Sequence, residues 1–147
     1  MTIFTVTRTT PLDVERAWAA VTDMHAHGEV VPLTVMRTDP GPPGLGWRFS
    51  AGTGAGRVRA WDHMIVTIWD PPGSRGPHGE LRIVKIGAWL RGWAQIVVEP
   101  HAEGAQVSWT EELGPRLDPI PRLTGPVSKV AGRRMFGAAL EELLARD

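Results

Sequence analysis

Apolar side chains near the end of the chain recur at helical spacing. Phe136, Ala139, Leu140 and Leu143 follow one another at steps of three and four, which places them on one face of an α-helix. The proline that opens this segment suits a first helical position, because its missing N–H would be unpaired there anyway. The pattern predicts a helix over residues 126–145, about 30 Å long.

Most of the preceding chain is rich in β-forming residues that alternate between apolar and polar. The predicted strands are residues 2–9, 30–38, 47–50, 57–69, 81–87, 91–99 and 106–113. Residues 40–44, 52–56 and 70–73 are predicted loops, residues 100–105 a hairpin, and residues 115–124 a proline-broken approach to the last helix. A sheet with one apolar face needs an apolar cover. We therefore expect an α+β fold, in which an antiparallel sheet of about seven strands curves around the C-terminal helix.

Two short helices are predicted after the first strand. Thr10 can cap the first of them, with a proline next and Asp13 in the place of a capping-box acid. Asp23 can cap a second helix that runs through His27, and Gly28 would stop it.

Alternation along the strands predicts which side chains face the helix. In residues 57–69 the more apolar set is Val58, Ala60, Asp62, Met64, Val66 and Ile68. In residues 91–99 it is Gly92, Ala94, Ile96 and Val98, and in residues 106–113 it is Val107, Trp109, Glu111 and Leu113. Asp62 and Glu111 are thus predicted to point inward, whereas Glu112 points outward. In residues 81–87 the inward face is ambiguous, with Ile83 and Lys85 on one face and Val84 and Ile86 on the other.

Inward acids and small residues predict a space rather than a filled core. An unpaired buried charge is costly, and Gly132 within a helix costs about 1 kcal/mol relative to alanine. The residues we expect to line such a pocket are Met64, Lys85, Ala94, Ile96, Trp109, Gly132 and Phe136. The alternative is that the acids lie at the rim of the sheet, or pair with Lys85 or an arginine as a structural ion pair.

Composition excludes several classes of protein. The 147 residues favour one domain over residues 1–147, and 16 basic and 16 acidic residues cancel. That balance argues against a general binder of nucleic acid or anionic membranes. There is no cysteine, no apolar run long enough to span a membrane and no signal-peptide pattern at the start, so we expect a cytoplasmic location. Seven tryptophans either fill a core or line a pocket.

The order of elements resembles the START/SRPBCC superfamily, which has the helix-grip fold of the birch pollen allergen. The resemblance is carried by residues 11–18 (PLDVERAW), Asp23, residues 69–72 (WDPP) and residues 107–111 (VSWTE), and it covers essentially the whole chain. The chain looks closest to the bacterial polyketide cyclase/dehydrase-like branch. Residues 27–34 (HGEVVPLT) and 83–85 (IVK) look like a subgroup of it with no settled function. The resemblance implies a cavity for a small hydrophobic molecule between sheet and helix; it does not imply catalysis.

Candidate catalytic residues are His27, Asp62 and Glu111. Histidine transfers protons readily near neutral pH, and an inward acid could act as a base while Lys85 stabilises a developing enolate. The alternatives are a helix-terminal His27 and a satisfied ion pair. No metal site is expected, because His25 and His27 do not share a helical face and no HExxH or CxxC pattern occurs. Residues 52–56 lack the GK[ST] of a phosphate-binding loop.

Three functions are compatible with these patterns. The first is a binding protein for a small hydrophobic or aromatic molecule, without a cofactor, and monomeric or homodimeric. The second is an acid–base enzyme that resembles a polyketide cyclase or dehydratase and uses His27 and the inward acids. The third is a protein-interaction module with a filled core. A cavity with a converging His–acid set would favour the second, and the lack of a cavity would favour the third.

Overall fold

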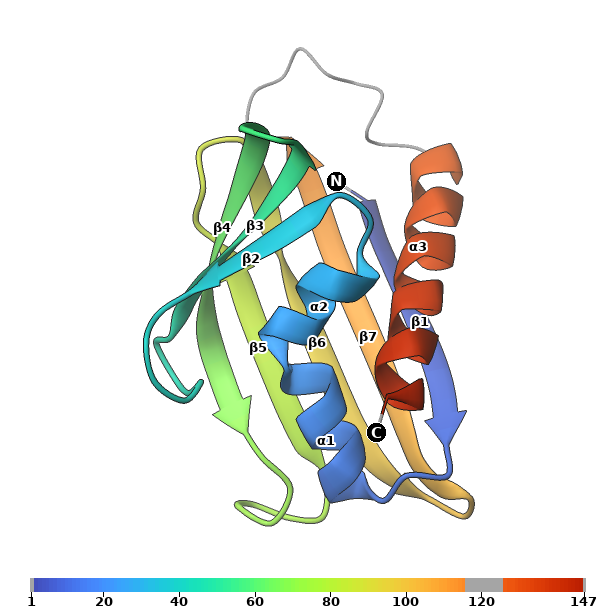
Figure 1. The fold of residues 1–147 in the computed structure, drawn as a ribbon. Helices are drawn as coiled ribbons and strands as arrows, with labels where there is room; N and C mark the ends of the chain where they lie inside the picture. Colours follow the sequence, from blue (N-terminus) through green and yellow to red (C-terminus); the bar gives the residue numbers. More distant parts are fainter. Residues whose placement is uncertain (1, 116–125, 147) are drawn as a thin grey trace.

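The chain forms a curved antiparallel sheet with three helices on its concave side (Figure 1). The computed structural model describes residues 2–115 and 126–146. The elements are β1 (Thr2–Thr10), α1 (Val14–Thr22), α2 (Met24–Val30), β2 (Thr34–Thr38), β3 (Arg48–Ala55), β4 (Val58–Asp70), β5 (Gly79–Lys85), β6 (Leu90–His101), β7 (Gly104–Pro115) and α3 (Pro126–Ala145). The predicted α+β class, the two short helices and the bounds of the C-terminal helix are confirmed. Residues 116–124 of the predicted proline-broken approach lie outside the described residues.

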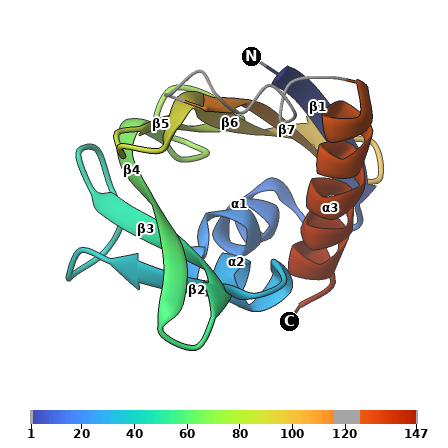
Figure 2. The same cartoon turned by 90° about the horizontal axis from the view of Figure 1, so that it is seen from above.

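The sheet is strongly curved, so that strands at its two ends lie on opposite sides of the concave face (Figure 2). Its seven strands are ordered β1-β7-β6-β5-β4-β3-β2, and every neighbouring pair is antiparallel. Seen from above, β1, β7, β6 and β5 form one wall, while β3 and β2 curl round to form the opposite one (Figure 2). Helices α1 and α2 lie between these walls, and α3 packs along β1 at the edge of the sheet. The curvature therefore leaves an enclosed interior between sheet and helices.

Two strand ends differ from the prediction because regular structure continues through glycine, in strand β3 and in helix α2. Strand β3 runs to Ala55, so the predicted loop over residues 52–56 is wrong except at Gly56. At Gly54, φ is 149° and an added Cβ would lie 2.1 Å from the Val58 carbonyl oxygen, so only glycine lets the two strands come so close. Helix α2 passes through Gly28 to Val30, and β2 consequently begins only at Thr34.

Asp13 and Asp23 fix the starts of the two short helices. The Asp13 side chain accepts a hydrogen bond from the Arg16 amide at 2.8 Å, so the predicted cap at Thr10 is wrong. Thr10 is instead the last residue of β1, and its hydroxyl accepts from the Leu12 amide at 3.3 Å. The predicted cap of α2 is confirmed, since Asp23 accepts from the Ala26 amide at 3.1 Å.

A β-bulge changes the inward face of β4. Val66 pairs with Ile83, but Ile68 pairs with Arg82, so Thr67 is an extra residue in this strand. The predicted inward position of Ile68 is therefore wrong, and Trp69 points inward in its place, with its ring 5.2 Å from that of Trp18. Val58, also predicted inward, is 83% exposed because it lies at the tip of the β3–β4 hairpin.

The other strands keep the predicted alternation. Leu81, Ile83 and Lys85 are buried, which settles the inward face of β5. In β7 the inward positions Trp109 and Glu111 are buried. Glu112 lies on the outer face, opposite Trp93 of β6.

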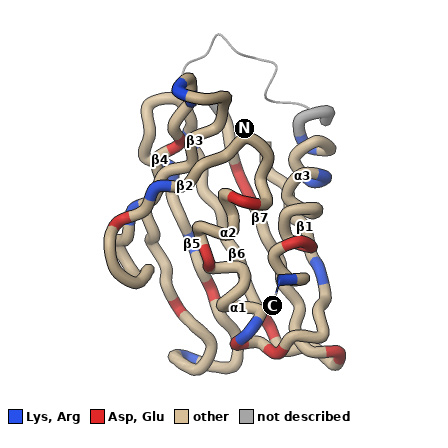
Figure 3. Tube along the Cα trace, viewed as in Figure 1, with Lys and Arg blue, Asp and Glu red and all other residues tan. Residues whose placement is uncertain are grey.

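Packing, rather than helix-dipole electrostatics, holds α3 in place. Positive charges lie toward its start and negative charges toward its end (Figure 3), which is opposite to the arrangement that a helix dipole favours. Leu140 and Leu143, on the predicted apolar stripe, are completely or almost completely buried. At the solvent-exposed margin of the α3–β1 contact, Arg8 of β1 donates to Glu141 of α3 at 2.8 Å, a surface pair of small energetic weight.

Four rings pack in a row from β1 to α2, and Gly132 makes room for the first of them. Phe4 stacks on Phe136 with ring centroids 5.5 Å apart, Phe136 lies 4.8 Å from Trp109, and Trp109 lies 5.2 Å from His27. An added Cβ on Gly132 would lie 2.7 Å from the Phe4 ring. The space beside Gly132 is thus occupied by Phe4, and the prediction that Gly132 opens a pocket is wrong.

Two alanine substitutions in α3 test this packing. Gly132→Ala should lower the free energy of unfolding by about 1 to 2 kcal/mol, because the buried Phe4 ring cannot move away without breaking its stack on Phe136. Gly137→Ala is the matched control, with the same gain in helix propensity, since its Cβ would meet the far end of the long Arg8 side chain at 2.7 Å and Val6 only at 3.8 Å. It should be neutral or stabilising by up to about 1 kcal/mol. Thermal and urea unfolding measure both, and equal stabilisation of the two variants would contradict the proposed contact.

Candidate functional site

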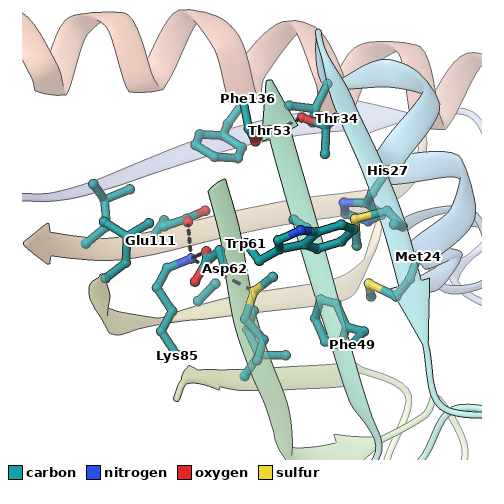
Figure 4. Close-up of a pocket in the computed structure, with 18 of the residues that line it drawn as sticks. Met24, His27, Thr34, Phe49, Thr53, Trp61, Asp62, Lys85, Glu111 and Phe136 are labelled. Carbon is teal, nitrogen blue, oxygen red and sulfur yellow. Dashed lines mark hydrogen bonds and ion pairs between the residues drawn. The ribbon is translucent and has the colours of Figure 1, made fainter. Parts of the chain in front are cut away.

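A cavity of about 450 Å³ lies between the concave face of the sheet and helices α2 and α3. Strands β2 to β7 all contribute to its wall, which is mostly aliphatic, aromatic and methionine side chains. Figure 4 shows the lining residues from β3 and β4 on one side and His27 and Phe136, from the two helices, on the other. Its size and its apolar wall with few polar groups are those of small-molecule sites in proteins.

Three charged side chains meet at one end of this cavity, and we call them the ionic cluster: Asp62 of β4, Lys85 of β5 and Glu111 of β7. The Lys85 ammonium donates to Asp62 Oδ2 and lies 3.5 Å from Glu111 Oε1 (Figure 4). Its side chain is only 4% exposed, and that of Glu111 only 7%. The three residues are far apart in sequence, and the sheet register brings them together, with Asp62 paired to Ala51, Lys85 to Met64 and Glu111 to Ala94.

Lys85 and Trp109 supply the donors around the two acids, through hydrogen bonds and one ion pair. Besides its two carboxylate partners, Lys85 Nζ lies 3.9 Å from the Met64 sulfur. The indole N–H of Trp109 donates to Glu111 Oε2 at 3.2 Å. Among the residues that the structure describes, Asp62 Oδ1 has no hydrogen-bond partner although it is buried.

Burial and charge shift the ionisation of two members of the cluster. Burial raises the pKa of Glu111, and the nearby Lys85 ammonium opposes this only in part. Burial by itself would lower the pKa of Lys85, but the carboxylates of Glu111 and Asp62 together raise it above its ordinary value. Lys85 is therefore a protonated cation at neutral pH, not an amine nucleophile.

His27 lines the cavity apart from the ionic cluster. It is 8% exposed, and its Nε2 lies 2.7 Å from the Val21 carbonyl oxygen, a hydrogen bond in which Nε2 carries the proton. Burial lowers the pKa of His27 against the smaller opposing effects of Val21 and Asp23, so the ring is neutral at pH 7. Trp109 lies between His27 and Glu111, contacting the first with its ring and the second with its N–H. No acid–histidine pair forms between these two residues.

The structure places most of the predicted pocket residues on the cavity wall. Met64, Lys85, Ala94, Ile96, Trp109 and Phe136 line it, as do His27, Asp62 and Glu111. Gly132 does not.

Sequence analysis missed lining residues from α2, β2, β3 and the β5–β6 connection, among them Met24, Met36, Phe49 and Trp89. Met24 stands three positions before His27, on the same helical face, so helical spacing could have predicted it as a lining residue. Trp89, 67% exposed in a turn, follows no period.

The described part of the chain holds neither a group of metal-binding side chains nor a membrane-spanning helix. Within residues 2–115 and 126–146, no three histidine, aspartate or glutamate side chains are grouped so as to hold a metal ion. No helix in those ranges is long and apolar enough to cross a membrane.

Comparison with known proteins identifies the family. Residues 1–146 match the family model for polyketide cyclase / dehydrase and lipid transport proteins. No curated protein matches.

Solved structures share the fold at low sequence identity. TTHA0849 from Thermus thermophilus is 14% identical, with a TM-score of 0.72 over 97% of this chain and 94% of its own. MLL2253 from Mesorhizobium loti is 20% identical, with a TM-score of 0.66 over 97% and 96%. Ara h 8.0201 is 14% identical, with a TM-score of 0.64 over 99% of both chains. The shared architecture is the helix-grip fold. Since the matching model spans residues 1–146, this chain belongs to the polyketide cyclase / dehydrase and lipid transport family of the START/SRPBCC superfamily.

Proposed function

We propose that this protein binds a small hydrophobic or aromatic molecule in the cavity between the sheet and helices α2 and α3. The observation that carries the proposal is the cavity itself, about 450 Å³ with a largely apolar wall and one polar end. A protein that served only as an interaction surface would have no use for such a space, because an empty cavity lowers stability. The family description, which includes lipid transport, supports the same function.

The opening of the cavity suits an apolar ligand. Trp89 and Met135 line it and are 67% and 43% exposed, so they lie where the cavity meets solvent. Large apolar side chains left exposed beside a cavity are a common feature of ligand entrances. A hydrophobic molecule entering here would pass these side chains before it reaches the methionines and rings within.

Acid–base catalysis is less well supported than binding. An enolate needs a free donor at the place where its charge develops, and the ammonium hydrogens of Lys85 already face Asp62, Glu111 and the Met64 sulfur. A neutral His27 could accept a proton, but its ring contacts Trp109 rather than either acid. The ionic cluster therefore serves better as a fixed polar end of a binding cavity than as an acid–base device.

Ligand binding can be tested by titration with 1-aminoanthracene, a neutral aromatic probe whose emission rises in apolar sites. We expect saturable binding to one site. Ala94→Leu should weaken binding by about tenfold or more, because Ala94 is buried on the cavity wall and three added carbons fill part of the space. Val97→Leu enlarges an outward side chain of the same strand and should leave the affinity unchanged. Absence of saturable binding, or equal affinity in both variants, would refute the proposal.

The ionisation of Glu111 predicts a pH-dependent gain in stability for Glu111→Gln. Because the folded pKa of Glu111 is raised, its favourable contribution is fully present below the unfolded pKa of about 4.5 and is lost as pH rises through the folded pKa. The glutamine variant avoids this loss and should be more stable than the wild type by about 1 kcal/mol at pH 7, and by less in acid. Urea unfolding between pH 4.5 and pH 8 measures the difference.

The neighbouring Glu112→Gln is the control for that measurement. It makes the same chemical change on the outer face and should alter stability by less than about 0.5 kcal/mol at every pH. A Glu111→Gln effect that does not vary with pH, or a larger effect at Glu112, would show that Glu111 is not the buried acid.

A further inference from the structure

The polar end of the cavity has more hydrogen-bond acceptors than donors. A carboxylate offers about four lone-pair sites, so Asp62 and Glu111 together offer about eight. The described side chains direct three donors at them: Lys85 toward each acid, and the Trp109 indole toward Glu111. The remaining acceptor sites, including the whole of Asp62 Oδ1, have no protein donor among the described residues.

The donors that contact these acceptors, on Lys85 and Trp109, are already engaged. Lys85 has three N–H groups, and Asp62 Oδ2, Glu111 Oε1 and the Met64 sulfur lie around them. The one indole N–H of Trp109 is also in use. A ligand group that can only accept hydrogen bonds would therefore have to break an existing contact in order to bind here, and leave a buried group unpaired.

The charges of the ionic cluster also disfavour a ligand carboxylate at this end of the cavity. The ionic cluster contains two carboxyl groups and one ammonium, and its surroundings are apolar and shielded from water. A ligand carboxylate placed beside it would meet like charge in a medium that screens poorly. A hydroxyl or an ammonium could instead donate to Asp62 Oδ1, which has no hydrogen-bond partner among the described residues.

We infer that the cavity selects ligands whose buried end carries a hydrogen-bond donor, such as an alcohol, a phenol or an amine, and that it rejects a carboxylate at that end. This inference rests on the proposed binding function and narrows its ligand class. Asp62 is the main acceptor. Its Oδ1 is buried, but the terminal torsion of an aspartate is soft, so the carboxylate can turn toward an arriving donor while Lys85 holds the other oxygen.

The rest of the ligand is expected to be apolar and to extend away from the cluster. Figure 4 shows Glu111, Asp62 and Lys85 together at one end of the cavity and Met24, Phe49 and His27 toward the other. Methionine sulfur and aromatic rings make favourable contacts with a flat aromatic body. An aromatic ring system with one hydroxyl or amino group fits both ends.

Three probes that differ only in the end group test the inference: 2-naphthol, naphthalene and 2-naphthoate. Each is measured at about pH 8 by displacement of 1-aminoanthracene from the intact protein. We expect 2-naphthol to bind about tenfold more tightly than naphthalene, the gain from one hydrogen bond to a charged acceptor, and 2-naphthoate to bind most weakly. Equal affinities, or tightest binding of 2-naphthoate, would overturn the inference while leaving the proposed function intact. No displacement by any of the three, together with no saturable binding of 1-aminoanthracene, would overturn both.

Asp62→Asn then tests the residue. The amide adds an N–H and removes a charge, so the preference for 2-naphthol over 2-naphthoate should fall about tenfold. Glu112→Gln, on the outer face, should keep the wild-type preference. If Asp62→Asn does not fold, Glu111→Gln removes the other carboxylate at nearly constant shape and should reduce the same preference. An unchanged preference in a folded variant of either acid would show that the ionic cluster does not determine which ligand end group binds more tightly.

Discussion

The contacts of Trp109 connect the parts of this structure that matter for its function. Its ring packs on Phe136 of α3 and on His27 of α2, and its N–H donates to Glu111 within β7. One side chain thereby joins the sheet to two helices and orients an acid of the ionic cluster. A buried indole is suited to this, because it offers a large apolar surface and a single donor that needs a partner. The aromatic row and the polar end of the cavity both depend on its position.

The interior combines features that oppose stability with a region that supports it. A cavity and a buried ionic cluster both cost free energy relative to a filled apolar core. The dense packing lies elsewhere, where side chains of α1, β6, β7 and α3 are almost completely buried, among them Val21, Val98, Val107, Leu140 and Leu143. The fold thus separates a well-packed core from a space kept open beside it. In a protein selected for stability alone, such a space would be filled, and this is the reason for proposing that it binds a ligand.

Local periodicity predicted most of the fold and much of the site. The repeat of 3.6 identified the C-terminal helix, and the repeat of two put Asp62 and Glu111 inside and Glu112 outside. The rule failed at Ile68, because the bulge at Thr67 adds a residue that no local pattern reveals. At Gly132 the period gave the correct face, but the inferred pocket was wrong, because the missing side chain accommodates Phe4 from a strand at the other end of the chain.

What the sequence by itself determined is which side chains of a regular strand or helix share a face, because that depends only on the geometry of one element. What only the tertiary structure decided is which inward side chains meet. Lys85 and Asp62 stand 23 residues apart, and their contact depends on the register of β4 on β5 and the curl of the sheet. Tertiary contacts also decided that Asp62 Oδ1 has no donor among the described residues and that Trp109 contacts both His27 and Glu111. Contacts between distant segments are set by the sum of many pairings along the sheet, and no short stretch of sequence contains that sum.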